Sequence, residues 1–183
     1  MIKKKIKKMT KKKIIAIIQA RFNSSRFPGK VLKKIGNKTI LEILLNRIKK
    51  SKKIDQIIVA TTNHKNDDKI LNLSKKLKYE CYRGSEKNVL DRFYKCSKKY
   101  SATDIIRITA DCPLLEYKFI DEMVDFYLKH NVDYASNNNP PTYPDGLDLE
   151  IMSFQTLKKA YLNARSLYDQ EHVTTYIKND NNL

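Results

Sequence analysis

The feature of this sequence that most constrains its fold is an alternation of short β-branched runs with longer amphipathic stretches. Strands are expected at residues 14–20, 56–61, 79–82, 104–109, 133–136 and 147–153. Helices are expected between and after them, at residues 40–50, 67–77, 89–100, 117–130, 154–164 and 169–178. Residues 14–20 form an apolar run, which is typical of a strand covered on both faces. Strands that alternate with helices predict an α/β fold with one doubly wound, mostly parallel sheet.

Length and composition fit one compact domain. A chain of 183 residues can bury a substantial core, and 41% of its residues are hydrophobic. We expect residues 1–12 to form a flexible basic tail and residues 13–183 to form the folded domain. No stretch approaches the length of a membrane span, and the apolar run at 14–20 is too short for an export signal. The three cysteines have no CxxC spacing, which favours a reducing cytoplasm over a disulfide framework or a zinc site.

The net charge of +17 suggests nucleic-acid binding, but its distribution does not support that interpretation. Lysine supplies 30 of the 37 basic residues, and eight of these lysines lie among the first 13 positions. Most of the others fall on the polar faces of amphipathic segments, where a solvated surface is the simpler explanation. Arginine, which reads bases better, is scarce. Nucleic-acid binding is therefore not predicted, and it stays a rival hypothesis.

The loop after the first expected strand is the most informative segment of the chain. Ligands of doubly wound sheets bind beyond the carboxyl ends of the strands, and the segment QARFNSSRFPGK, residues 19–30, leaves such an end. Arg21, Arg26 and Lys30 can offset much of the charge of a triphosphate, and the small residues among them let the backbone approach an anion. A surface turn with incidental basic residues is the alternative. Position and composition together favour anion binding.

A carboxylate follows a later strand in a similar position. Asp111 stands just beyond the strand expected at 104–109, in the segment RITADCPLL. At this place it could hold Mg²⁺ between triphosphate oxygens. Asp111 lies too far upstream to cap the helix expected at 117–130, so a capping role is the weaker interpretation.

The segment QARFNSSRFPGKVL resembles the opening signature of the cytidylyltransferases that activate acidic sugars. These include the CMP-Kdo and acylneuraminate synthetases and, most closely, the spore coat polysaccharide biosynthesis proteins. Further segments similar to that family are VATTNHKNDD (59–68), RGSEKNVLDRF (83–93), RITADCPLL (107–115), PPTYPDGLDLE (140–150) and DQEHVTTYI (169–177). The resemblance spans residues 13–177 and implies a Rossmann-like nucleotidyltransferase fold. The chain departs from the family pattern at Asn23, Gln170 and Thr175, where Gly, Arg and Pro are usual.

The resemblance also implies a role for particular residues. Arg21, Ser24, Arg26 and Lys30 would contact the triphosphate of CTP, and Asp111 would be the metal ligand. The other implied residues are Thr61, Arg83, Gly84, Ser85 and Arg92 for the nucleotide, and Asp145, Asp148, Glu150, Glu171 and His172 for the acceptor sugar.

Simpler interpretations stay open for several of these segments. Asn66 or Asp67 would cap the helix expected at 67–77, which explains the carboxylates there at least as well as a nucleotide contact. The RGS segment and Arg92 could equally form a turn and a surface ion pair. A single histidine on an amphipathic helix, such as His172, is more often structural than catalytic.

Together these features predict a Mg²⁺-dependent cytidylyltransferase that transfers CMP from CTP to a sugar and releases pyrophosphate. Arg21 and Lys30 would stabilise the charge on the phosphates, and Asp111 would anchor the metal. A related nucleotidyltransferase with another nucleotide or acceptor, and a non-catalytic nucleotide-binding remnant, are the alternatives. Relatives of this kind continue through a further acidic motif, so we expect the domain to be incomplete at its C-terminus and the isolated chain to be impaired. Whether the chain forms a homodimer, and whether the acceptor is Kdo, a nonulosonic acid or another surface sugar, stays open.

Overall fold

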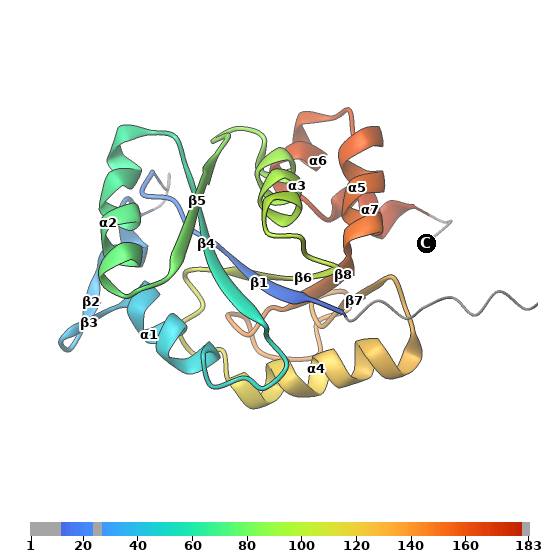
Figure 1. Ribbon diagram of the computed structural model, residues 1–183, viewed down its shortest axis with the longest axis horizontal. Helices are drawn as coiled ribbons and strands as arrows, with labels where there is room; N and C mark the ends of the chain where they lie inside the picture. Colours follow the sequence, from blue (N-terminus) through green and yellow to red (C-terminus); the bar gives the residue numbers. More distant parts are fainter. Residues whose placement is uncertain (1–11, 24–26, 181–183) are drawn as a thin grey trace, which may run out of the picture.

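The computed structural model describes residues 12–23 and 27–180, and within them one six-stranded sheet carries the fold (Figure 1). The strands are β1 (Ile14–Gln19), β4 (Gln56–Thr62), β5 (Glu80–Gly84), β6 (Asp104–Thr109), β7 (Tyr134–Ser136) and β8 (Glu150–Ser153). Their order across the sheet is β5-β4-β1-β6-β8-β7. β1, β4, β5 and β6 are parallel, whereas β8 runs antiparallel to both β6 and β7. The predicted α/β class and mostly parallel sheet are confirmed.

Helices cover both faces of the sheet, as in doubly wound folds. They are α1 (Ile40–Ile48), α2 (Asp68–Lys76), α3 (Val89–Lys99), α4 (Tyr117–His130), α5 (Phe154–Asn163), α6 (Leu167–His172) and α7 (Thr175–Asn179). The apolar sides of α1, α2 and α4 pack on one face. Those of α3, α5 and α7 pack on the other, so the sheet separates two cores (Figure 1).

β1 lies in the middle of the sheet and contributes to both cores. Ala16 and Ile18 pack on the side of α1 and α4, while Ile15 and Ile17 pack on the side of α3 and α5. All four residues are fully buried. The apolar run in the sequence therefore reflects a strand whose alternate side chains both meet a helical layer.

Three local features differ from the sequence-based expectations. The strand expected at 147–153 begins only at Glu150. The helix expected at 169–178 is divided into α6 and α7 by Val173, whose φ of 65° cannot continue a helix. The small hairpin of β2 (Lys34–Ile35) and β3 (Lys38–Thr39), turned at Gly36, was not expected because its strands have two residues each. Two short 3₁₀ helices, Lys30–Leu32 and Lys65–Asp67, complete the elements.

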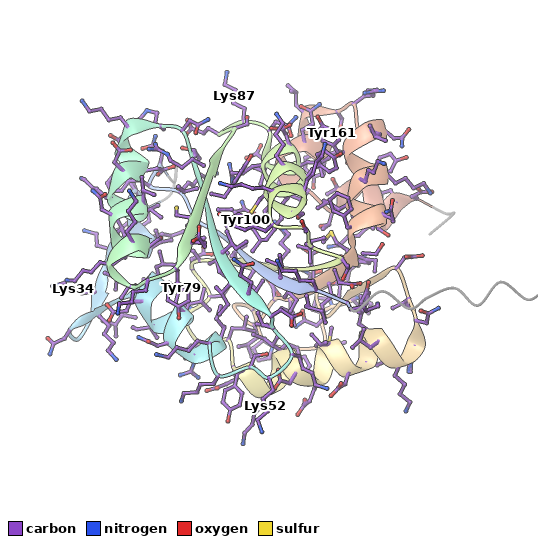
Figure 2. The ribbon with its side chains drawn as sticks, in the orientation of Figure 1. Lys34, Lys52, Tyr79, Lys87, Tyr100 and Tyr161 are labelled. Carbon is purple, nitrogen blue, oxygen red and sulfur yellow. The ribbon has the colours of Figure 1, made fainter. Side chains whose placement is uncertain are left out.

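The lysines that dominate the charge lie mainly on the periphery. Lys34, Lys52 and Lys87 are exposed, and Figure 2 shows their side chains projecting outward. This arrangement agrees with a solvated surface and gives no contiguous basic stripe from these three positions. Within the part of the chain that the structure describes, no helix is both long and apolar enough to cross a membrane. Residues 1–11 of the predicted basic tail lie outside the described residues.

Replacing Ile17 with Ala should lower the free energy of unfolding by roughly 2–5 kcal/mol, because the side chain is fully buried and its removal leaves a cavity in the core. Ile35 is 58% exposed, so Ile35→Ala should change the same free energy by at most about 0.5 kcal/mol. Urea unfolding followed by circular dichroism measures both. Equal losses in the two variants would contradict the central place of β1.

Candidate active site

The carboxyl ends of β1, β4, β5 and β6 meet at one edge of the sheet, because these strands are parallel. Gln19 at the end of β1 lies beside Ala60 of β4 and Thr109 of β6. Thr62 at the end of β4 lies beside Gly84, the last residue of β5. The loops that follow these strands therefore lie next to one another, as the binding loops of α/β sheets do.

Lys30 and Asp111 form an ion pair that joins the loops after β1 and β6. Both side chains are partly accessible, at 27% and 36% exposure. Burial alone would raise the pKa of Asp111, but hydrogen bonding and the positive charge of Lys30 outweigh burial and lower the pKa. Asp111 is therefore ionised near neutral pH. The predicted cation and carboxylate do converge at the strand tips.

Lys30 is preceded by a turn that needs glycine at position 29. The backbone N–H of Gly29 donates to the carbonyl of Phe22 at 2.7 Å, and Gly29 has a φ of 70°. A Cβ atom at this position would lie 2.8 Å from the Phe22 ring. Only glycine combines this dihedral angle with that close approach, and the turn delivers Lys30 to Asp111. The predicted contacts of Ser24 and Arg26 lie outside the described residues.

Arg21, on the loop after β1, lines a cavity of about 490 Å³. The other lining residues are Glu86, Lys87, Leu167 and Glu171. Arg21 Nη2 lies 4.0 Å from a carboxylate oxygen of Glu171, so α6 and the loop after β1 face each other across the cavity. His172 is exposed on α6, where its ring packs against Tyr168 with 4.3 Å between centroids.

Arg83 has a different environment from the one that the resemblance implies. Its guanidinium donates to the carbonyls of Thr62 and His64, at 2.8 and 2.9 Å, and to the carboxylate of Asp68 at 2.6 Å. These partners lie at the end of β4, in the loop that follows it and at the start of α2. In this structure Arg83 braces that segment, and a nucleotide contact for Arg83 stays a prediction.

Arg92 of α3 is completely buried, and it lies against Gly84, the last residue of β5. A Cβ atom on Gly84 would lie 2.9 Å from Arg92 Cγ, so the absence of a side chain at position 84 lets the arginine fit. Arg92 donates to the carbonyl of Ser85. Burial, and after it the charge of Arg21, lowers the pKa of Arg92 to about 10. The surface ion pair considered as an alternative for Arg92 is wrong, because the side chain is not at the surface.

Two side chains near the strand tips have polar atoms without a hydrogen-bond partner among the described residues. One is the guanidinium of Arg92, through its Nε and Nη2 atoms, and the other is the hydroxyl of Thr61. Both side chains are fully buried. An unpaired donor in a buried position costs free energy, and a nucleotide contact for these groups stays a prediction.

Asp111 follows β6, and Asp145 and Asp148 precede β8, the strand paired with β6. Asp145 is exposed and Asp148 is half-buried. Burial raises the pKa of the Cys112 thiol, and the negative charges of Asp111, Asp148 and Asp145 raise it further. The charges of all three carboxylates therefore act on Cys112.

Glu150 is a structural residue in this arrangement. It is 2% exposed, and its carboxylate pairs with Arg107 and, at 3.1 Å, with Lys178. The same carboxylate accepts hydrogen bonds from the Tyr134 hydroxyl at 2.6 Å and the Thr174 hydroxyl at 2.8 Å. Burial alone would raise the pKa of Glu150, but these partners, Arg107 first, lower it to about 2. A sugar contact for Glu150 finds no support here, because both oxygens are already bound within the protein.

Capping of α2 by the Asp67 side chain was one of the interpretations left open for this segment, and for Asp67 it is wrong. Asp67 precedes α2 but its side chain makes no capping hydrogen bond. Its buried carboxylate instead accepts from Thr62 and from the backbone N–H of Phe22, 45 positions earlier. No pattern within ten residues of Asp67 could have indicated this partner.

The fold is that of nucleotidyltransferases. The solved structure of a cytidylyltransferase from Leptospira borgpetersenii is similar, with a TM-score of 0.90 and 34% identity, and the match covers 93% of this chain and 73% of that chain. The sequence profile described as cytidylyltransferase matches residues 15–183. The chain therefore belongs to the cytidylyltransferase family.

Curated relatives agree with this assignment. An uncharacterized protein of Methanocaldococcus jannaschii is 52% identical over 93% of this chain and 69% of its own length. The spore coat polysaccharide biosynthesis protein SpsF of Bacillus subtilis is 35% identical over 91% of this chain and 70% of its own length. A 3-deoxy-manno-octulosonate cytidylyltransferase of Solibacter usitatus is 32% identical over 62% of this chain and 44% of its own length. The predicted family resemblance is confirmed.

The network around Glu150 should make stability depend on acid pH. The folded-state pKa of about 2 lies below the ordinary value of 4.5, so the stabilisation is complete above 4.5 and is lost as the pH falls towards 2. Glu150→Gln removes the charge and leaves Arg107 and Lys178 without a counter-ion, which should cost roughly 3–5 kcal/mol at neutral pH. Urea unfolding at a series of pH values measures both effects. The exposed residue Glu122 provides the control, and Glu122→Gln should show neither effect.

Proposed function

We propose that this protein transfers CMP from CTP to a sugar acid. The observation that carries the proposal is the Lys30–Asp111 ion pair, which joins the tips of β1 and β6 in a chain of the cytidylyltransferase family. In the proposed reaction a sugar hydroxyl oxygen forms a bond to the α-phosphorus of CTP. The bond between that phosphorus and the oxygen bridging to the β-phosphorus breaks, pyrophosphate leaves, and the hydroxyl proton is released.

The residues at the strand tips suit this chemistry because phosphoryl transfer depends on positioning and on the neutralisation of charge. Lys30 and Arg21 are cations on the loop after β1, and they would stabilise the charge that moves onto the leaving phosphates. Ser24 and Arg26 would add further contacts from the same loop. The unpaired donors of Arg92 and the hydroxyl of Thr61 would meet the nucleotide, with Arg83, Gly84 and Ser85 holding the adjacent turn.

Asp111 is the residue that would hold a divalent cation, and we propose Mg²⁺. Its carboxylate is partly accessible and is kept ionised by Lys30. Within residues 12–23 and 27–180, no group of three or more acidic, histidine or cysteine side chains could hold a metal by itself. One carboxylate combined with substrate phosphates is, however, the ligand set that Mg²⁺ commonly uses. When bound, the ion would neutralise part of the triphosphate charge.

A sugar acid is the proposed acceptor because of the family members that the chain resembles. Relatives include a spore coat polysaccharide protein and 3-deoxy-manno-octulosonate cytidylyltransferases. Asp145 and Asp148 would bind hydroxyl groups of the sugar, since carboxylates repel its acidic group, and Glu171 and His172 would approach it from α6. The free thiols Cys96 and Cys112 fit the proposed cytoplasmic location. A homodimer and the absence of nucleic-acid binding remain predictions.

Pyrophosphate release measured with each of the four nucleoside triphosphates, with Mg²⁺ and a panel of sugar acids, tests the proposed function. CTP should give the fastest release. Faster release with another nucleotide would favour a related nucleotidyltransferase. Binding of CTP without release would favour a nucleotide-binding remnant.

Lys30→Met should lower kcat by on the order of a hundredfold, because a preorganised cation facing the transferred phosphate is removed. Asp111→Asn should lower kcat similarly and should also weaken the dependence of the rate on Mg²⁺ concentration. Lys34→Met, at an exposed position on β2, is the matched control and should leave the rate unchanged. Steady-state kinetics measures all three variants. An unchanged rate in Lys30→Met would overturn the proposed role of the ion pair.

A further inference from the structure

The buried carboxylate of Asp67 links the loop after β4 to the loop after β1. Asp67 is 2% exposed. One of its oxygens accepts a hydrogen bond from the backbone N–H of Phe22 at 2.6 Å. The other accepts from the backbone N–H of Thr62 at 3.1 Å and from the Thr62 hydroxyl. Both carboxylate oxygens are therefore bound, and every donor belongs to the edge of the sheet where the site lies.

The bond to Phe22 acts directly beside Arg21. The N–H in question belongs to the peptide unit that joins Arg21 to Phe22, so Asp67 fixes that unit as the chain leaves β1. The carbonyl of the same Phe22 accepts from Gly29, which closes the turn leading to Lys30. The N–H of Phe22 therefore donates to Asp67, and its C=O accepts from Gly29. The direction of both Arg21 and Lys30 depends on these two bonds.

The segment that carries Asp67 is itself braced. Arg83 donates to the carbonyls of Thr62 and His64 and to the carboxylate of Asp68, so it bonds on both sides of Asp67 in the sequence. A second link to the loop after β1 comes from the side chain of Asn66, which donates to the Asn23 side chain at 3.1 Å. The β4–α2 segment is therefore a rigid support against which the loop after β1 is fastened at two points.

Neither helix capping nor metal binding explains Asp67. Its side chain makes no capping bond to α2, and its oxygens are occupied by protein donors in a buried position. A carboxylate that accepts backbone N–H bonds is a strong and short-range constraint. Such a constraint keeps the cations of the loop in place before the ligand arrives, which lowers the ordering cost of binding.

We propose that Asp67 is a positioning residue for the triphosphate of CTP, acting through the peptide between Arg21 and Phe22, with Arg83 holding Asp67 in place. This inference rests on the proposed function. In this proposal Asp67, near the end of the VATTNHKNDD segment, orients the loop after β1. Asp67 itself does not contact the nucleotide.

The test compares Asp67→Asn, which affects the chain just after the carboxyl end of β1, with a matched variant that affects the amino end of β1. Asn keeps the shape of the side chain but offers one acceptor oxygen, so either Phe22 or Thr62 loses its partner. Asp55 also accepts a β1 backbone N–H, that of Ile14 at 2.7 Å, but it does so at the amino end of β1, away from the site. Asp55→Asn therefore removes a comparable bond from β1 without affecting the loop.

Asp67→Asn should raise the KM for CTP and its Kd about tenfold or more, because a charge-assisted hydrogen bond that orders the loop is lost. Hydrogen exchange at the Phe22 amide should accelerate in the same variant. Asp55→Asn should leave the KM, the Kd and the exchange of Phe22 unchanged. Unfolding midpoints of both variants give the fraction of folded protein in each assay.

Three outcomes would overturn the proposal: an unchanged Kd in Asp67→Asn, equal losses of CTP affinity in the two variants, or unchanged exchange at Phe22. If Asp67→Asn does not fold, the exposed Asn66→Ala cuts the second link instead and should weaken CTP binding about two- to tenfold, and no weakening would overturn the proposal. Absence of CTP binding by the unaltered chain would refute the proposed function itself, which separates the two failures.

Discussion

β1 is hydrogen-bonded to a parallel neighbour along each edge and packed against helices on each face, and the candidate site is built from its carboxyl end. Its side chains cannot turn to solvent, so the direction in which the chain leaves Gln19 is fixed by the sheet. Arg21 follows after one residue, and the turn at Gly29 brings Lys30 back towards β6. The two cations therefore derive their positions from the least deformable element of the protein.

Around this rigid strand, the polar residues divide between those left accessible and those used inside the protein. Lys30, Asp111 and Asp148 remain partly accessible at the strand tips. Glu150, in contrast, is buried and engaged with protein partners that join neighbouring elements. A carboxylate enclosed by cations and hydroxyls is costly to disturb, whereas an accessible one can exchange its partner for a ligand. This difference separates the candidate ligand-binding groups from the supports that hold them.

The sequence alone was sufficient for most strands and helices, because their apolar periodicity is local, although it missed the late start of β8 and the break at Val173. It was also sufficient for the meeting of Lys30 with Asp111, because both follow parallel strands. It was insufficient where a residue's partner depends on the register between distant elements. Asp67 is bonded to Phe22 and Glu150 to Lys178, and neither pair is visible in any single motif. The small hairpin at Gly36 was missed for a different reason, since two-residue strands have no periodicity to detect.

The close packing of Gly84 and Arg92 has an evolutionary consequence. The α3 arginine occupies the space that a side chain at the end of β5 would need, so neither position is free to change alone. A lineage that replaced the glycine would first have to shorten the arginine, and a lineage that lost the arginine would be left with a void. Among descendants of this fold, substitutions at the two positions should therefore arise in pairs.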